Sequence, residues 1–204
     1  SDDGNEVLLG IDRPFYALDV RRAGGIYLID DERNDARYVL GENIGEFRHN
    51  SEYYELQGGW SRGLQGRWVR RWTAGASYDR DRFEPDPEEP LGGPLPADRE
   101  LVYPWVGFEL VEDGFQERVN QDQILRTEDV LVGLRASARL GYAAEALGSD
   151  RNALIASASV QDGADFGARQ SVFGSMSASG RLEGGELVNG VLAAEGRSYR
   201  ATSS

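Results

Sequence analysis

The strongest constraint on the fold is the alternation of side chains in residues 130–142, VLVGLRASARLGY. Every second position carries Val, Leu, Ala or Tyr, whereas the positions between them include Arg135, Ser137 and Arg139. Successive side chains of a β-strand point to opposite faces of a sheet, and no helix divides residues in this way. The run exceeds the roughly 5–6 residues usual in soluble strands, and a tilted strand needs about 9–11 to cross a bilayer. The pattern therefore predicts either a strand of a large soluble sheet or a strand of a membrane barrel.

The same alternation recurs along the chain, and the side facing away from the apolar residues is rich in Ser, Thr, Gly, Glu and Arg. It is regular in residues 53–61, 72–79, 154–161 and 172–183. It is less regular in residues 14–30, 101–112 and 186–200, where further strands are expected. We count about eight strands. The side chains on their polar faces are too small and too polar to fill a closed core, so we expect water in the volume that these faces enclose.

The connections between the expected strands differ in length. Short, Gly-rich hairpin turns are expected at residues 61–67, 148–150, 162–169 and 183–186. Long loops, acidic or rich in proline, are expected at about 30–50 and 84–99. Outer-membrane barrels combine short periplasmic turns with long external loops, so this arrangement favours a membrane barrel.

Charge and composition exclude several classes of protein. The chain has 22 basic and 35 acidic residues and a formal net charge of −13, so nucleic acid is not expected as a partner. It has no cysteine, which excludes disulfides and thiol chemistry. It has no run of 18 apolar residues, which argues against a transmembrane helix but not against strands that cross a membrane.

Candidate chemistry is sparse. The single histidine, His49, is expected to be an ordinary residue of a polar loop, which removes histidine-based triads and most zinc sites. The acidic residues Asp30, Asp31, Glu32 and Asp35 offer oxygen ligands for calcium but lack the spacing of an EF-hand, so a solvated loop is the preferred interpretation. We therefore expect no catalytic residue, no metal and no cofactor, and the protein is not expected to be an enzyme.

If the strands belong to a membrane barrel, the alternation assigns each side chain to the lumen or to lipid. An arginine on the lipid face at mid-depth costs about 2–4 kcal/mol, so Arg135 and Arg139 are expected to face the lumen, where Glu55, Asp79 or Glu195 could pair with them. Their expected role is to hold the strands in register, and guiding a translocating segment is the alternative. The expected lumen-facing residues are Glu55, Gln57, Thr73, Ser77, Asp79, Arg135, Ser137 and Arg139. The expected lipid-facing residues are Leu56, Trp60, Trp72, Val132, Leu134, Leu140, Tyr142 and Leu154.

Several segments resemble the barrel region of the bacterial surface-antigen family, which includes the barrel-assembly insertase and the two-partner-secretion transporters. These segments are RPFYALD at 13–19, GWSRGL at 59–64, WVRRWTAGASYDRDRFEP at 68–85, LVYPWVGFELVEDGF at 101–115 and NQDQILRTEDVLVG at 120–133. The resemblance implies a sixteen-stranded barrel that follows periplasmic POTRA domains and carries an Arg-Gly-Tyr or Arg-Gly-Phe motif on a lumenal loop. This sequence has neither a POTRA-like pattern before residue 14 nor that motif, so it resembles an interior part of such a barrel, and the residues of the motif cannot be carried over.

We therefore expect an all-β, antiparallel, up-and-down transmembrane β-barrel region covering residues 1–204, incomplete in itself. The remaining strands would come from a longer parent chain or another subunit. The resemblance implies a place in the bacterial outer membrane, with lipid around the barrel and an unfolded or translocating polypeptide as substrate. The alternative is a soluble or surface-exposed β-sheet binding module that uses its acidic loops. A barrel enzyme is the weakest hypothesis, because no nucleophile and base can be assembled.

Overall fold

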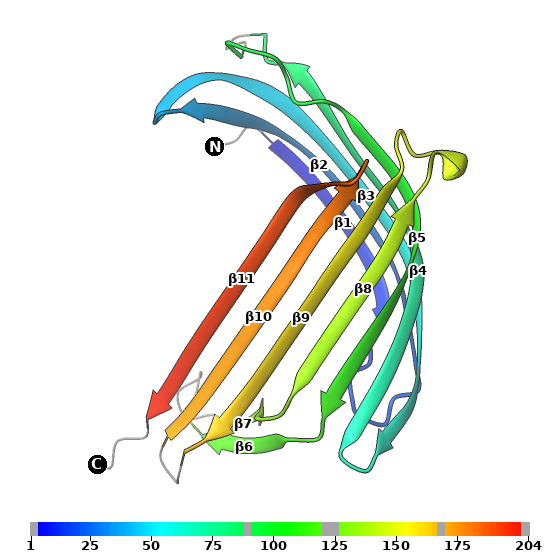
Figure 1. Cartoon of the computed structure of the whole chain (residues 1–204), viewed down its shortest axis with the longest axis vertical. Helices are drawn as coiled ribbons and strands as arrows, with labels where there is room; N and C mark the ends of the chain where they lie inside the picture. The colour runs from blue at the N-terminus through cyan, green and yellow to red at the C-terminus, as the bar shows by residue number, and fades with distance from the viewer. Residues whose placement is uncertain (1–3, 88–90, 120–126, 167–169, 201–204) are drawn as a thin grey trace.

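The computed structural model describes residues 4–87, 91–119, 127–166 and 170–200, and nearly all of them lie in β-strands. Nine strands form one antiparallel sheet in which each strand pairs with the next, and two short strands form a separate hairpin (Figure 1). The large sheet consists of β1 (Gly4–Arg13), β2 (Arg22–Val39), β3 (Glu42–Gln65), β4 (Trp68–Pro85), β5 (Arg99–Glu112), β8 (Arg135–Ala143), β9 (Ala153–Asp165), β10 (Gln170–Glu183) and β11 (Glu186–Arg200). The small hairpin consists of β6 (Phe115–Val119) and β7 (Thr127–Leu131).

This architecture confirms the expected all-β, antiparallel, up-and-down fold, with nine strands in the main sheet where about eight were expected. The sheet is not closed, since β1 and β11 each have one hydrogen-bonded neighbour among the described strands. β1 was missed, although Val7, Leu9 and Ile11 alternate with Glu6 and Asp12 in the sequence. The strand expected at 14–30 is a connection followed by β2, which begins at Arg22.

The stretch 30–50 is not a long loop, and this prediction was wrong. β2 and β3 continue through it as a hairpin closed at Leu40 and Gly41, both of which have positive φ. Its many charged side chains suggested a solvated loop. In the structure, Arg33 pairs with Asp31 and Asp35 along β2, and Arg48 pairs with Glu32 across the two strands. We call residues 31–51 the arm. The other expected long loop, at 84–99, is a connection between Pro85 of β4 and Arg99 of β5.

The run 130–142 is not one continuous strand either. Val130 and Leu131 belong to β7 and pair with β6, and β8 begins only at Arg135. The break falls at Gly133, where a Cβ atom would lie 3.2 Å from Cβ of Glu112 and 3.3 Å from Cα of Gly114. The chain changes partners there because two backbone segments approach each other closely.

The short turns are found at or near the expected places. Gly184 and Gly185 join β10 to β11, and both have the positive φ that a tight hairpin turn requires. The stretch 61–67 is mostly strand, because β3 continues to Gln65 through an irregularity in its pairing with β4. The stretch 148–150 is part of a longer connection between β8 and β9 that includes a short 3-10 helix, η1 (Glu145–Leu147). In the stretch 162–169, β9 runs on to Asp165, and residues 167–169 lie outside the described part of the chain.

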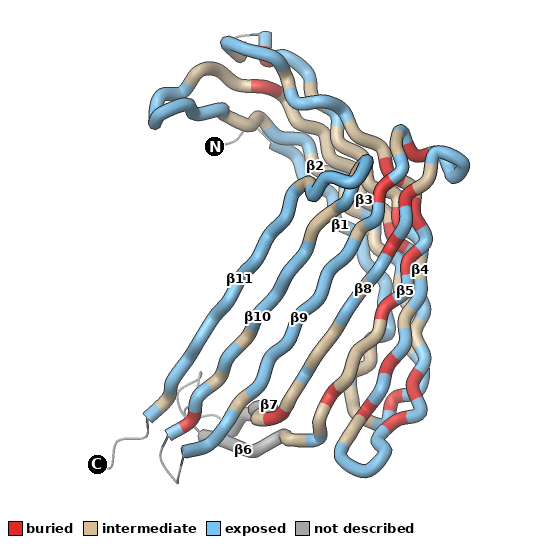
Figure 2. The backbone as a smooth tube through the Cα atoms, in the orientation of Figure 1, coloured by how far each residue is buried: buried red, intermediate tan, exposed pale blue. Residues whose placement is uncertain are grey.

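The sheet curls strongly around β4, β5 and β8 because glycines face aromatic side chains on its inner side. A Cβ on Gly75 would lie 2.7 Å from Cζ2 of Trp105, and one on Gly141 would lie 2.8 Å from Cδ2 of Tyr103. Without Cβ atoms at these positions, the rings lie directly on the neighbouring backbones. Buried residues concentrate in β3, β4, β5 and β8, whereas β9 to β11 are mostly exposed (Figure 2).

The strand connections gather at two ends of the sheet (Figure 1). At one end, the arm end, lie the arm, the connection from β4 to β5, the connection from β8 to β9 and the turn from β10 to β11. At the other, the base end, lie residues 14–21, the tight turn from β3 to β4, and the β6–β7 hairpin. These two ends serve below to describe where charges and aromatic rings fall.

Candidate functional site

The two faces of the sheet have different chemistry, and strand register defines them residue by residue. Glu55 of β3 lies opposite Ser77 of β4, and Ser77 lies opposite Tyr103 of β5. One position along, Leu56 lies opposite Ala76. Side chains of the Glu55 row meet one another across several strands, as described below, so the sheet curls towards them and theirs is the concave face.

All eight side chains expected to face a lumen lie on the concave face. Six of the eight expected to face lipid lie on the convex face. These six are Leu56, Trp60, Trp72, Leu140, Tyr142 and Leu154. The exceptions are Val132 and Leu134, which lie in the irregular segment between β7 and β8 and belong to no strand. Leu134 donates its backbone N–H to Oε2 of Glu112, at 3.1 Å.

The centre of the concave face is a network around the buried carboxylate of Glu55. Arg139 of β8 donates from Nη2 to Glu55 Oε2, at 2.5 Å, and Glu55 is one of the three acids considered as its partner from the sequence. Ser77 donates its hydroxyl to the same oxygen, at 2.9 Å, and Tyr53 donates its phenol to it. The Arg139 guanidinium also lies 3.6 Å from the centre of the Trp105 ring. Side chains from four strands, β3, β4, β5 and β8, therefore meet around the Glu55–Arg139 ion pair.

A second network lies on the concave face nearer the base end. Arg135 pairs with Glu109 of β5 at 2.5 Å, and not with the acids that the sequence analysis proposed. Glu109 also accepts from Arg71, at 2.7 Å, and Arg71 lies over the ring of Phe15, 5.0 Å from its centre. Since Arg71 also donates to the carbonyl of Ala17, at 3.2 Å, the connection from β1 to β2 is held against the inner side of the sheet.

A third network lies in the arm, where His49 is found. His49 was expected in a polar loop, and this prediction was wrong, because β3 continues through it. Its Nδ1 lies 3.0 Å from Asp35 of β2 and its Nε2 lies 3.0 Å from Asp81 of β4, while its ring stacks on Phe83 at 4.6 Å. The histidine therefore joins three strands. Asp31 and Asp35, two of the acids considered for calcium, pair with Arg33.

The concave face is not uniformly wet, which corrects the expectation for the volume that it encloses. Towards the arm end, Leu101, Tyr103, Trp105, Ala143 and Ala153 form a buried apolar cluster. Sequence reasoning missed these residues, and also Glu109 and Arg71. Trp105 lies opposite both Gly75 and Gly141, which leave room for its ring to lie flat, but that pairing depends on register, which alternation does not give. The wall made by β9 and β10 is different, since it carries exposed serines at 157, 159, 177 and 179.

The convex face carries an uncharged band across all nine strands. Its large side chains are exposed, for example Leu56 at 60%, Trp72 at 55% and Leu192 at 75%. On β4 the band runs between Arg70 and Arg80, which lie about 33 Å apart along an extended strand. Two rows of aromatic rings lie near its borders. Tyr54 and Tyr78 stack at 5.6 Å towards the arm end, and Trp72 contacts Phe108 at 4.7 Å towards the base end.

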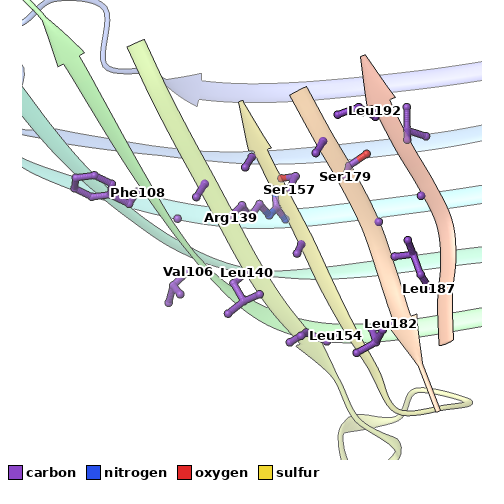
Figure 3. Close-up of a pocket in the computed structure, with 18 of the residues that line it drawn as sticks. Val106, Phe108, Arg139, Leu140, Leu154, Ser157, Ser179, Leu182, Leu187 and Leu192 are labelled. Atoms are coloured by element: carbon purple, nitrogen blue, oxygen red, sulfur yellow. The ribbon is translucent and has the colours of Figure 1, made fainter. Parts of the chain in front are cut away.

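A shallow depression of about 880 Å³ lies in this band over β8, β9 and β10 (Figure 3). Its floor is made by Ala methyl groups and Gly backbone in cross-strand rows, and Leu140, Leu154, Leu182 and Leu192 stand around it. No polar side chain on the convex face lines it, because Arg139, Ser157 and Ser179 belong to the concave face. The depression is part of the apolar face and has no reactive group.

Within the described residues, no group of His, Asp and Glu side chains is arranged to hold a metal ion. No helix in the described part of the chain is long and apolar enough to cross a membrane. Comparisons with models of protein families, with curated proteins and with solved structures find no match. The fold and the two faces define the chain as an open, curved, antiparallel β-sheet with an apolar convex side and an ion-paired concave side.

Proposed function

We propose that this sheet is part of a bacterial outer-membrane β-barrel, with lipid against its convex face and an aqueous lumen along its concave face. The uncharged convex band carries the proposal. Barrel strands tilt by about 40°, so the 33 Å or so between Arg70 and Arg80 corresponds to about 25 Å along the membrane normal, the height of the apolar band in outer-membrane barrels. A soluble sheet would expose this entire face to water, at a cost of about 25 cal/mol per Å².

The distribution of charge supports the same orientation. Arg135 and Arg139 both lie on the concave face and are paired with carboxylates, so neither would face hydrocarbon. Glu55, Ser77 and Asp79 share that face. In a barrel, a lumen accommodates such groups, whereas a lipid-facing arginine is costly.

The unpaired edges of β1 and β11 require partners under this proposal. A strand edge within hydrocarbon leaves N–H and C=O groups unsatisfied, so every membrane barrel is closed. We propose that further strands, from a longer parent chain or another subunit, complete the sheet between β11 and β1. The serine wall of β9 and β10 would then face a lumen wider than nine strands enclose.

Protein insertion or translocation is the specific role that we propose for the completed barrel. The support is the resemblance of segments such as 68–85 and 101–115 to the surface-antigen family. The proposed substrate is an unfolded polypeptide, which the hydroxyl groups of Ser157, Ser159 and Ser177 would contact without strong attachment.

A binding module is the second candidate, and the arm favours it. The connection from β4 to β5 supports the arm, since Gly92 donates its N–H to the carbonyl of Ile44 at 2.9 Å and Arg37 donates to that of Pro94 at 3.1 Å. At the tip, Leu40 is fully exposed with a φ of 53°. A leucine in this conformation is unusual, and we propose the tip as the contact point of the binding module.

The test of a membrane barrel is detergent dependence together with heat-modifiable migration of the purified chain on a denaturing gel. We expect a species that needs detergent or lipid to remain monodisperse and that migrates as a compact form until it is boiled. A monodisperse protein in plain buffer, with a β-sheet circular dichroism spectrum, would contradict the barrel and favour the binding module.

A further inference from the structure

Four arginines lie at the base-end border of the convex band, one on each of the first four strands. They are Arg13 of β1, Arg22 of β2, Arg62 of β3 and Arg70 of β4, and we call them the arginine rim. Register places Arg13, Arg22 and Arg70 on the convex face, because they lie opposite Gly24, Trp60 and Leu110. Arg62 lies over the convex ring of Trp60, 5.8 Å from its centre. All four are exposed.

The arginine rim is unpaired within the described part of the chain. None of its four guanidinium groups forms an ion pair or hydrogen bond with a described residue. The arm-end border of the same band is different. There Asp30, Glu52, Arg80 and Glu100 form one cross-strand row, and Arg80 lies 3.5 Å from Glu52 and 3.8 Å from Glu100. Thus the arm-end row carries three acids around one paired arginine, whereas on the first four strands the base-end border presents only positive charge.

The position of the rim matches one depth in a bilayer. Register aligns Arg13 of β1 with Ala74 of β4, which lies four residues from Arg70 towards the arm end. The rim therefore shifts towards the base end from β1 to β4. The shift is about 13 Å along the strand direction over about 14 Å across the four strands. Four groups with this shift lie at one height if the strands tilt by roughly 43° from the membrane normal. Strands of membrane barrels tilt by about 35–45°, so the four arginines would lie at nearly the same height. The aromatic side chains of Trp60 and Trp72 lie directly inside the rim, where interfacial aromatic residues belong.

We propose that the arginine rim binds the phosphate groups of anionic lipids in the leaflet at the base end. This inference rests on the proposed membrane barrel and names the lipid class at one of its borders. Guanidinium groups bind phosphate with paired hydrogen bonds, and each arginine near an anionic surface contributes about 1 kcal/mol of attraction. A protein partner is less well matched, because the rim is a narrow line between an apolar band and solvent.

The experiment is co-flotation of the full chain with vesicles of phosphatidylcholine alone and with vesicles that also contain phosphatidylglycerol. Despite the net charge of −13, we expect the protein to prefer the anionic vesicles, and added salt to weaken that preference. The double variant Arg22→Gln/Arg70→Gln should lower the preference by about tenfold or more. The matched control is Arg37→Gln/Arg48→Gln, which changes the net charge equally at the arm end and should keep the preference.

The outcomes separate this inference from the proposed function. If the rim variant keeps the preference, or the control loses it equally, the rim does not bind lipid phosphate, although the barrel proposal survives. If inorganic phosphate binds the wild type but not the rim variant, and the wild type shows no preference for anionic vesicles, the rim binds free phosphate and the lipid assignment is wrong. If neither wild type nor variants associate with phosphatidylcholine vesicles, the membrane barrel itself is contradicted.

Discussion

Arg139 of β8 and Glu55 of β3 form an ion pair of 2.5 Å although β4 and β5 lie between their strands. Neighbouring strands are about 4.8 Å apart, so in a flat sheet the two backbones would be separated by about 14 Å. Direct contact requires the sheet to curl towards these side chains. The ion pair therefore accompanies the curvature that distinguishes a concave from a convex face.

We expect Arg139→Met to lower the free energy of unfolding by about 3 kcal/mol, because Glu55 would keep a buried charge without its partner. The double variant Arg139→Met/Glu55→Gln should recover part of that loss, which a double-mutant cycle in denaturant would measure. As a control, Arg135→Met removes a half-exposed arginine and should cost less than about 1 kcal/mol. Equal losses for Arg139→Met and Arg135→Met would contradict a central role for the Glu55 network.

Gly75 should tolerate no side chain, because Trp105 occupies the space above it. An added Cβ would lie 2.5 Å from the carbonyl oxygen of Leu56 and 2.7 Å from the indole. We expect Gly75→Ala to destabilise the sheet by about 1–3 kcal/mol, as overpacking does. Gly58 lies in the same part of the sheet and has nothing within 4 Å of its added Cβ, so Gly58→Ala should be nearly neutral. Thermal unfolding of both variants checks this, and similar losses would refute the packing explanation.

The face of each strand was predictable from the sequence, whereas the details of the concave side were not. Alternation alone separated Glu55 from Leu56 and Arg139 from Leu140, because strand geometry has a period of two. The choice of Glu109 as partner of Arg135 depended on how β5 pairs with β8, and alternation carries no information about strand register. The arm was misjudged for a related reason. Charged residues such as Asp35 favour loops on average, but here Asp35 pairs with Arg33 along β2 and with His49 across to β3.

His49 should hold the arm to β4. We expect His49→Ala to increase amide hydrogen exchange in residues 42–50, because the contacts of the ring with Asp35, Asp81 and Phe83 are lost together. Exchange in β9 and β10 should stay unchanged, since they are remote from the arm. Arg48→Ala, on the opposite face of the same strand, serves as the control. Unchanged exchange in His49→Ala would show that the hairpin is held by its backbone pairing alone.

The connection from β8 to β9 should respond to acid through Asp150. Hydrogen bonds from Arg151, at 2.7 and 2.9 Å, lower the pKa of the Asp150 carboxyl below its ordinary value. A lowered pKa contributes stability above the ordinary value, and that contribution is lost as pH falls through the folded-state pKa. Arg151→Gln should therefore raise the pKa of Asp150 and move this loss to higher pH. Carboxyl carbon NMR of Asp150 would measure it, and an unaltered titration would argue against the Arg151 contact.

The most direct test of the account is a quenching scan along β9, made possible because the chain has no cysteine. Single cysteines at 156, 157, 158 and 159 would each carry an environment-sensitive fluorophore, in protein reconstituted into lipid. We expect quenchers attached to acyl chains to act on positions 156 and 158, on the convex face, and water-soluble quenchers to act on 157 and 159. Equal access of water-soluble quenchers to all four positions would contradict the assignment of lipid to the convex face and of a lumen to the concave face.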